Sequence, residues 1–310
     1  MSSSPQVLLP QLAADLPPPP SRWKPYKRFV RTQPFGIIGL ALLVLVIVSS
    51  VAAPLISSHD PQKFSGDVLL GPSLDHPFGT TRDGKDVFAR ILYGGRVSLK
   101  VGVAVVLVSI LGGTLLALLA GYIGGVVDFL LSRIAELLVS FPAILLALTL
   151  RTSIGDDVPN LPFLSKGEIL VIISICILFT PGIFRIMRGA VLEQRGALYV
   201  ESARVVGAPE TRIMLRHVLP NLAGLMIVVT STALPGAILT ESGLSFLGVG
   251  VPVGTPSWGT DLSGSARSFF VRAPWIAIFP GLALSITVLG FNLLGDALRD
   301  ALDPRLRGRL

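Results

Sequence analysis

One segment of the chain carries glycine and lysine at nearly the spacing that binds phosphate. Gly79, Gly84, Lys85 and Asp86 almost fit the pattern G-x-x-x-x-G-K-[ST], in which backbone amides and the lysine hold a nucleotide. Asp86 stands where a hydroxyl should hold magnesium, and its carboxylate would repel phosphates. No apolar strand leads into the segment. We therefore predict that no ATP binds here and that the chain binds no cofactor of its own.

Residues that could bind a metal or catalyse a reaction are few. The chain has one cysteine and three histidines, so Cys176 can form no intrachain disulfide and is interpreted as a small buried apolar residue. His59-Asp60 and Asp75-His76 share one loop and could hold a cation, but nothing in the sequence fixes their separation. We predict no metal site. No nucleophile motif, set of paired intramembrane carboxylates or dinucleotide fingerprint indicates an enzyme.

A charged stretch between two apolar segments has the most informative pattern, and we consider it as residues 197–220. Residues 201–206 can form a short helix, Gly207 can adopt the left-handed conformation that ends it, and Pro209 suits the first turn of another. An ordinary connecting loop needs no such arrangement. Two short helices at an angle would present Glu201 to a soluble partner, together with Arg204, Arg212 and Arg216.

Composition places this stretch in a membrane protein. Hydrophobic residues make up 51% of the chain and charged residues only 15%, and the mean hydropathy is +0.71. We therefore expect an all-α membrane protein with six transmembrane helices, each of roughly 20 residues, which crosses about 30 Å of hydrocarbon. A cleaved signal peptide is the alternative interpretation of the first span. The predicted spans are 35–56, 97–120, 129–150, 169–187, 218–240 and 275–295.

Lysine and arginine are distributed unevenly among the segments that join the spans. Residues 1–34 and 185–217 are strongly basic, whereas the other connections carry balanced charges. We expect both termini and the 197–220 stretch in the cytoplasm of a cell-membrane protein. The net charge of +7 follows from this topology and gives no reason to expect nucleic-acid binding. The predicted organisation is a disordered tail at 1–34, a first span at 35–56, an extracytoplasmic loop at 57–96, a transmembrane core at 97–296 and a cytoplasmic tail at 297–310.

Few ionisable residues lie within the spans, so each is a functional candidate with a structural alternative. Arg133 and Glu136, three positions apart, are expected to pair and neutralise each other. Lys100 is expected to extend its ammonium group toward the membrane surface, and Glu241 is a candidate for an external gate. Hydroxyl groups can line a polar passage or bond to their own helix. The candidates for such a passage are Thr230, Ser231, Thr232 and Asn292.

Proline and glycine occur at informative positions in the spans. Interior prolines free backbone groups and suit a moving pathway, although kinks in a static bundle are the alternative. Glycines on one helix allow a close approach by another helix, in this chain or in a partner. The prolines are Pro142, Pro181, Pro235 and Pro280, and the glycines are Gly112, Gly113, Gly121 and Gly125.

The stretch at 199–221 resembles the EAA loop of ABC importer permeases. The family's Glu-Ala-Ala, Gly and Leu-Pro positions are matched in order, with serine for the second residue of the motif. A histidine, His217, stands where the family has isoleucine. The residues that correspond to the motif are Glu201, Ser202, Ala203, Gly207, Leu219 and Pro220.

The resemblance extends over roughly residues 30–308 and is to the C-type subunit of the dipeptide, oligopeptide and nickel branch of these permeases. It implies a type I importer fold that pairs with a B-type permease, with two cytosolic ATPase subunits that hold ATP and magnesium, and with an extracytoplasmic solute-binding protein. The matching segments include 76–80, 121–125, 216–221, 244–248, 255–259, 273–275, 291–296 and 303–305.

The resemblance also implies a function and roles for residues. The chain would form half of the pathway of an ATP-driven importer of short peptides, without hydrolysing ATP itself. Glu201 would contact a basic residue of an ATPase subunit, Gly207 would form the bend, and Leu219-Pro220 would join the stretch to the fifth span. Nickel, glutathione or opine-like compounds are alternative cargoes. An ATPase-independent channel and a membrane-embedded enzyme are the alternatives from other classes.

Overall fold

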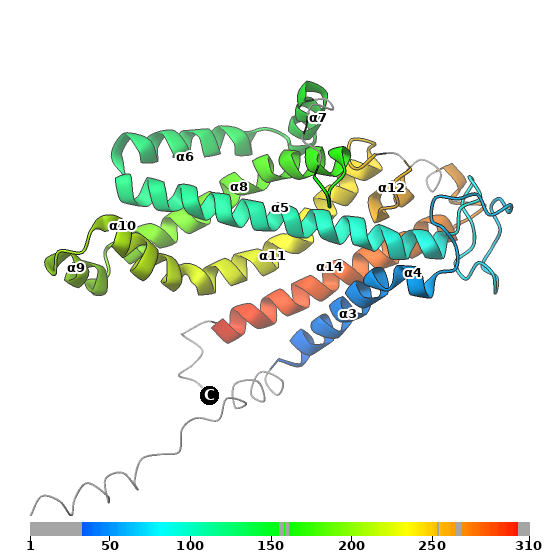
Figure 1. The fold of residues 1–310 in the computed structure, drawn as a ribbon, viewed down its shortest axis with the longest axis horizontal. Helices are drawn as coiled ribbons and strands as arrows, with labels where there is room; N and C mark the ends of the chain where they lie inside the picture. Colours follow the sequence, from blue (N-terminus) through cyan, green and yellow to red (C-terminus); the bar gives the residue numbers. More distant parts are fainter. Residues whose placement is uncertain (1–32, 155–157, 159–160, 253, 264–267, 303–310) are drawn as a thin grey trace, which may run out of the picture.

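The structure is a computed structural model that describes residues 33–154, 158, 161–252, 254–263 and 268–302, so the predicted disordered tail lies almost wholly outside it. Within those ranges every regular element is a helix. Figure 1 shows the long helices running side by side in one bundle. The elements are α3 (Pro34–Val51), α4 (Ala53–Ile56), α5 (Val87–Ile123), α6 (Gly125–Ser140), α7 (Ala143–Ile154), α8 (Lys166–Arg195), α9 (Leu198–Val205), α10 (Glu210–Ile213), a π-helix (Met214–Val218), α11 (Leu219–Phe246), α12 (Trp258–Leu262) and α14 (Trp275–Leu302).

Five helices in the described part of the chain are long and apolar enough to cross a membrane. They are α3, α5, α8, the continuous helix from α10 to α11, and α14. The pair α6 and α7 adds a sixth span if it is counted as one, although its two halves are bent by 97°. The fold is therefore the helical membrane fold that the sequence predicts.

The bent pair falls where the sequence predicts an unbroken third span at 129–150. Helix α6 ends at Ser140, Phe141 is extended, and Pro142 precedes α7. Proline has no amide hydrogen and disfavours the helical conformation in the residue before it, so the chain turns there. The other three interior prolines, Pro181, Pro235 and Pro280, lie inside helices that continue through them.

Two helices extend beyond the predicted spans. Helix α5 begins at Val87 because the Asp86 carboxylate accepts a hydrogen bond from the Ala89 amide at 2.6 Å, which caps the first turn. The predicted loop at 57–96 therefore ends at 86. Helix α14 continues to Leu302 with Ala297 buried, so the predicted tail at 297–310 is helical over its first part.

Glycines set how closely the helices pack. Helix α5 packs most extensively on α8. A Cβ atom added to Gly113 would lie 2.9 Å from Ile183 Cγ2, and one added to Gly121 would lie 2.4 Å from Val191 Cγ1. These two contacts require glycine, as predicted. Gly125 has open space around it within this chain.

Candidate functional site

The stretch at 197–220, which we call the knuckle, lies at one end of the bundle, and the long loop before α5 lies at the other end (Figure 1). Helix α9 stops at a Schellman turn in which the Ala208 amide bonds to the Ala203 carbonyl at 3.0 Å and the Gly207 amide bonds to the Arg204 carbonyl at 2.8 Å. Gly207 has a φ of +83°, which confirms the predicted left-handed bend. Pro209 then begins the next helix as its N-cap residue.

The second half of the knuckle differs from the sequence-based prediction. Helix α10 is not a separate short helix, because it continues through the π-helix Met214–Val218 directly into α11. Pro220 lies in the first turn of α11 and cannot donate to the carbonyl four residues before it. A π-helical turn at this place accommodates the missing hydrogen bond. Leu219 and Pro220 therefore lie within one long helix rather than at a joint.

Buried side chains fix the knuckle to the long helices. Val200 of α9 and Ile213 of α10 are fully buried and belong to one hydrophobic cluster with Met187 and Val191 of α8. The Arg195 side chain at the end of α8 also donates to the Gly121 carbonyl of α5 at 2.8 Å. Displacement of the knuckle must therefore displace α8 and α11 as well, because close-packed interiors transmit strain.

The outer surface of the knuckle combines apolar and acidic groups. Val205 and Val206 are 89% and 87% exposed and lie directly before the bend. Glu201 and Ser202 are exposed on α9, and Ala203 is half-buried. Among the described residues, none forms a hydrogen bond or ion pair with the Glu201 carboxylate.

The arginines of the knuckle do not all face outward as predicted. Arg204 Nε lies 2.8 Å from Glu210 Oε1, so this ion pair spans the bend. The hydrogen bond to Glu210 raises the pKa of the Arg204 guanidinium, which keeps the charge in place. Arg212 and Arg216 remain exposed. The predicted contact surface therefore keeps two of its three arginines.

The candidate pathway residues do not form one polar surface within this chain. Glu241 is fully buried in α11 and accepts hydrogen bonds from Ser245 Oγ at 2.7 Å and from Ser242 Oγ at 3.3 Å. Ser231 is also buried and donates to the Val228 carbonyl of its own helix at 2.9 Å. Thr232 likewise bonds to its own helix, Thr230 is half-buried, and Asn292 is exposed on α14.

Ion pairs account for the charged residues in two of the spans. Arg133 Nη1 lies 2.6 Å from Glu136 Oε2 on an exposed face of α6. Lys100 Nζ lies 2.6 Å from Oε1 of the buried Glu168, in the first turn of α8, and its predicted extension toward the membrane surface stays a prediction. Ser165 and Glu168 form a capping box that begins α8, and the S-x-x-E spacing is the sequence signal that would have identified it.

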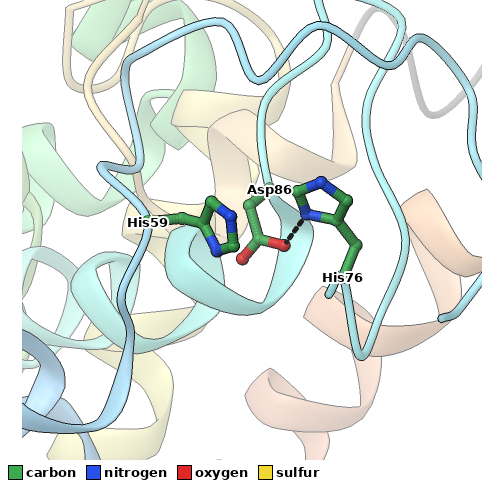
Figure 2. Close-up of side chains that lie close together, drawn as sticks. All are labelled: His59, His76 and Asp86. Carbon is green, nitrogen blue, oxygen red and sulfur yellow. Dashed lines mark hydrogen bonds and ion pairs between the residues drawn. The ribbon is translucent and has the colours of Figure 1, made fainter. Parts of the chain in front are cut away.

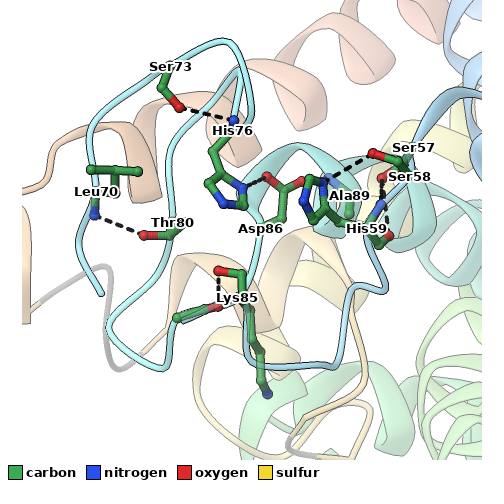
Figure 3. A network of polar contacts seen from close by, with 12 residues as sticks. Ser57, Ser58, His59, Leu70, Ser73, His76, Thr80, Lys85, Asp86 and Ala89 are labelled. Atoms are coloured by element: carbon green, nitrogen blue, oxygen red, sulfur yellow. Dashed lines mark hydrogen bonds and ion pairs between the residues drawn. The ribbon is translucent and has the colours of Figure 1, made fainter. Parts of the chain in front are cut away.

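The loop at 57–86 folds into a compact polar network at the opposite end of the bundle (Figure 3). The segment that resembles a phosphate loop closes on itself, because Leu70 N–H donates to Thr80 Oγ1 at 2.8 Å and Lys85 N–H donates to Thr81 Oγ1 at 3.1 Å. Asp86 is 1% exposed and caps α5. This segment is thus a turn that ends at the N-cap residue of α5.

Two of the three histidines meet in this network. Figure 2 shows the Asp86 carboxylate between the imidazole rings of His59 and His76. His76 Nδ1 lies 2.8 Å from Asp86 Oδ1, and the two ring centroids are 4.7 Å apart. The sequence indicated His59 and His76 but did not indicate Asp86 as their neighbour.

The fold and the knuckle together define a class of protein. A bundle of apolar helices long enough to cross a membrane, with a helical bend packed against one end, is the architecture of a multi-pass membrane protein. The comparison with protein families identifies the particular family. Residues 113–308 match the model of the binding-protein-dependent transport system inner membrane component, and the chain belongs to this family.

Curated relatives agree with this assignment. The chain is 37% identical to the dipeptide transport system permease protein of Alkalihalophilus pseudofirmus, with 93% of this chain and 91% of that protein covered. It is 40% identical to the glutathione transport system permease protein of Pectobacterium atrosepticum, with 92% of each chain covered. It is 39% identical to a putative peptide transport system permease protein of Brucella suis, with 91% of each chain covered. The chain is thus a multi-pass permease component of a transport system.

Proposed function

We propose that this chain is the C-type permease subunit of an ATP-driven importer of short peptides. The knuckle is the part that an ATPase subunit holds. The observation that carries this proposal is the unpaired Glu201 carboxylate beside Val205 and Val206, on a bend that is anchored in the core through Val200 and Ile213. The two adjacent exposed valines offer an apolar surface that a partner could cover, and the acidic group beside them favours a basic partner surface.

The transporter of this proposal contains several chains. A B-type permease supplies the other half of the pathway, two cytosolic ATPase subunits hold ATP and magnesium, and an extracytoplasmic binding protein delivers the cargo. The knuckle and both termini lie in the cytoplasm. The excess of arginine and lysine in residues 1–34 and 185–217 supports this orientation, because such segments stay on the cytoplasmic side.

The mechanism follows from the anchoring of the knuckle. Closure of the ATPase pair on ATP moves the knuckle, and the buried contacts of α9 and α10 pass the movement to α8 and α11. The helices then reach an outward-open state, and hydrolysis of ATP reverses the change. The chain itself hydrolyses no ATP and binds neither the nucleotide nor magnesium.

The cargo is proposed from the relatives. Their names specify dipeptides, peptides and glutathione, which is itself a tripeptide. A short peptide is therefore the substrate class that the three relatives share. Nickel or another small solute carried by the same architecture is the alternative, because the binding protein selects the cargo. The buried side chains of Glu241 and Ser231 offer no substrate contact within this chain.

The test is ATP hydrolysis by the assembled complex, with and without binding protein loaded with peptide. Glu201→Lys should remove the stimulation by loaded binding protein, because it places a cation against the basic surface of the ATPase. Asp300→Lys makes the same charge change on an exposed residue at the end of α14, on the cytoplasmic side but outside the knuckle, and should leave the stimulation intact.

Two outcomes would contradict the proposal at different points. Native stimulation in Glu201→Lys would show that this carboxylate does not couple the subunits. Absence of any ATPase subunit from the complex purified with the native chain would refute the importer function itself. Transport of a dipeptide, glutathione and nickel into proteoliposomes that contain the complex then identifies the cargo.

A further inference from the structure

We propose that His59, His76 and Asp86 form a zinc site in the loop before α5. The three residues come from different parts of that loop: His59 follows α4, His76 lies in the middle, and Asp86 is the last residue before α5. One possible ligand atom of each residue lies within 4.8 Å of the others. Figure 2 shows the carboxylate between the two rings, so the three groups converge on one volume.

Two of the three ligands are already held in place. His76 and Asp86 are 4% and 1% exposed, and His76 Nδ1 lies 2.8 Å from Asp86 Oδ1. The other carboxylate oxygen accepts the Ala89 amide at 2.6 Å, and the His76 backbone amide donates to Ser73 Oγ at 3.1 Å (Figure 3). Supporting hydrogen bonds of this kind orient metal ligands and are needed for tight binding.

A metal ion would take the place of one proton in this arrangement. The hydrogen bond between His76 Nδ1 and Asp86 Oδ1 contains a proton, which the ring nitrogen donates to the carboxylate. Binding of a divalent cation breaks that hydrogen bond: the proton of the neutral ring moves to Nε2, and the lone pairs of Nδ1 and of the carboxylate then face the metal. The N–O separation of 2.8 Å is shorter than the roughly 3.3 Å between two ligands of a tetrahedral zinc ion, so the two groups must separate by about 0.5 Å and the ring must turn.

His59 supplies the third ligand and access from solvent. It is half-buried and lies on the wall of an open pocket of about 460 Å³, which residues 57–62, Tyr93 and Pro256 line. Ligands of a tetrahedral zinc ion lie roughly 3.3 Å apart, given bond lengths of about 2.0 Å, and the ligand atoms here lie within 4.8 Å of one another. The His59 ring must therefore move inward by at most about 1.5 Å. The pocket provides an entry path and space for water as the fourth ligand.

The chemistry of the ligands favours zinc over calcium and magnesium. Two imidazole nitrogens and one carboxylate oxygen suit zinc, whereas calcium and magnesium prefer oxygen ligands alone. Bound zinc would tie the segment after α4 to the first turn of α5. It would therefore fasten the first transmembrane helix to the core at the end of the bundle opposite the knuckle (Figure 1).

The experiment measures zinc bound by the full chain in detergent, purified with an affinity tag that contains no histidine. Equilibrium dialysis followed by elemental analysis should give one zinc per chain. His59→Ala removes a ligand without removing the buried pair, and it should weaken binding at least about tenfold, since loss of a supporting residue alone costs roughly 10–100-fold. Asp86 is not the residue to substitute first, because it also caps α5.

The third histidine of the chain is the matched control. His217 lies in the π-helix of the knuckle, far from the loop, and His217→Ala should bind zinc as the native chain does. Cobalt added in place of zinc should give the visible absorption of a tetrahedral site in the native chain and in His217→Ala, but not in His59→Ala. The proposal is refuted if the native chain binds no stoichiometric zinc, if His59→Ala retains the native affinity, or if His217→Ala loses as much.

Discussion

Replacement of Gly207 tests whether the backbone at the bend, rather than side-chain packing, shapes the knuckle. Gly207 has a φ of +83°, and a Cβ atom added there would meet no other atom within 4 Å. The cost of a side chain is therefore entirely conformational. An L-residue in the left-handed region costs about 1–2 kcal/mol, asparagine tolerates that region better than other residues, and a β-branched residue is the least suited to it.

The expected effect can be followed at the Schellman turn. Strain of about 1–2 kcal/mol in the closed turn makes its open form about 5–30-fold more populated. The hydrogen bond from the Ala208 amide to the Ala203 carbonyl breaks in that form. Hydrogen exchange at the Ala208 amide should therefore accelerate by about that factor in Gly207→Ala. The increase should be larger in Gly207→Val and smaller in Gly207→Asn.

Hydrogen exchange with mass spectrometry on the purified chain is the assay, and peptides that cover 203–210 are the readout. Gly189→Ala is the control, because Gly189 lies inside α8 with open space around it and the substitution favours the helix. Equal exchange in the valine, alanine and asparagine variants would refute the reasoning, since the strain depends on the side chain. So would faster exchange in the control.

Two further predictions concern packing and charge within the bundle. Gly121→Ala should lower the free energy of unfolding by about 1–3 kcal/mol, because its Cβ would lie 2.4 Å from Val191 Cγ1. Val191→Ala in the same chain should restore the melting temperature measured in detergent. A double variant no more stable than Gly121→Ala would argue against this contact. Lys100→Met should destabilise the chain by about 1–3 kcal/mol, because it leaves the buried Glu168 carboxylate without its cation. Glu168→Gln in the same chain should recover most of the loss. An unchanged melting temperature in Lys100→Met would show that the ion pair contributes nothing to stability.

Features that depend on neighbouring residues were predictable from the sequence. Long apolar segments indicated the spans, because crossing a bilayer requires about 20 apolar residues in a row. The Gly207 bend followed from glycine's freedom to adopt positive φ, and the structure has that bend. The order of the EAA-like residues predicted the permease family, and the family match confirms it.

Boundaries were harder to predict where a helix leaves the apolar segment. Helix α5 begins ten residues before the predicted span, and that first part includes Arg90 and Arg96, which hydropathy assigns to a loop. Arg90 is nevertheless buried, because its Nε donates to Asp261 Oδ1 at 2.6 Å from a residue 171 positions away. The burial of Arg90 in a helix thus depends on an ion pair with a residue that is distant in the sequence.

Convergence of distant residues was decided by the tertiary structure alone. Arg204 turns back to Glu210 across the bend, Lys100 reaches Glu168 on another helix, and His59 and His76 meet around Asp86. The sequence by itself determined a membrane permease with a knuckle between two spans, because hydropathy and backbone preferences act over a few residues. The tertiary structure decided which charges pair and which ligands meet, because separations between distant residues are set only when the helices pack.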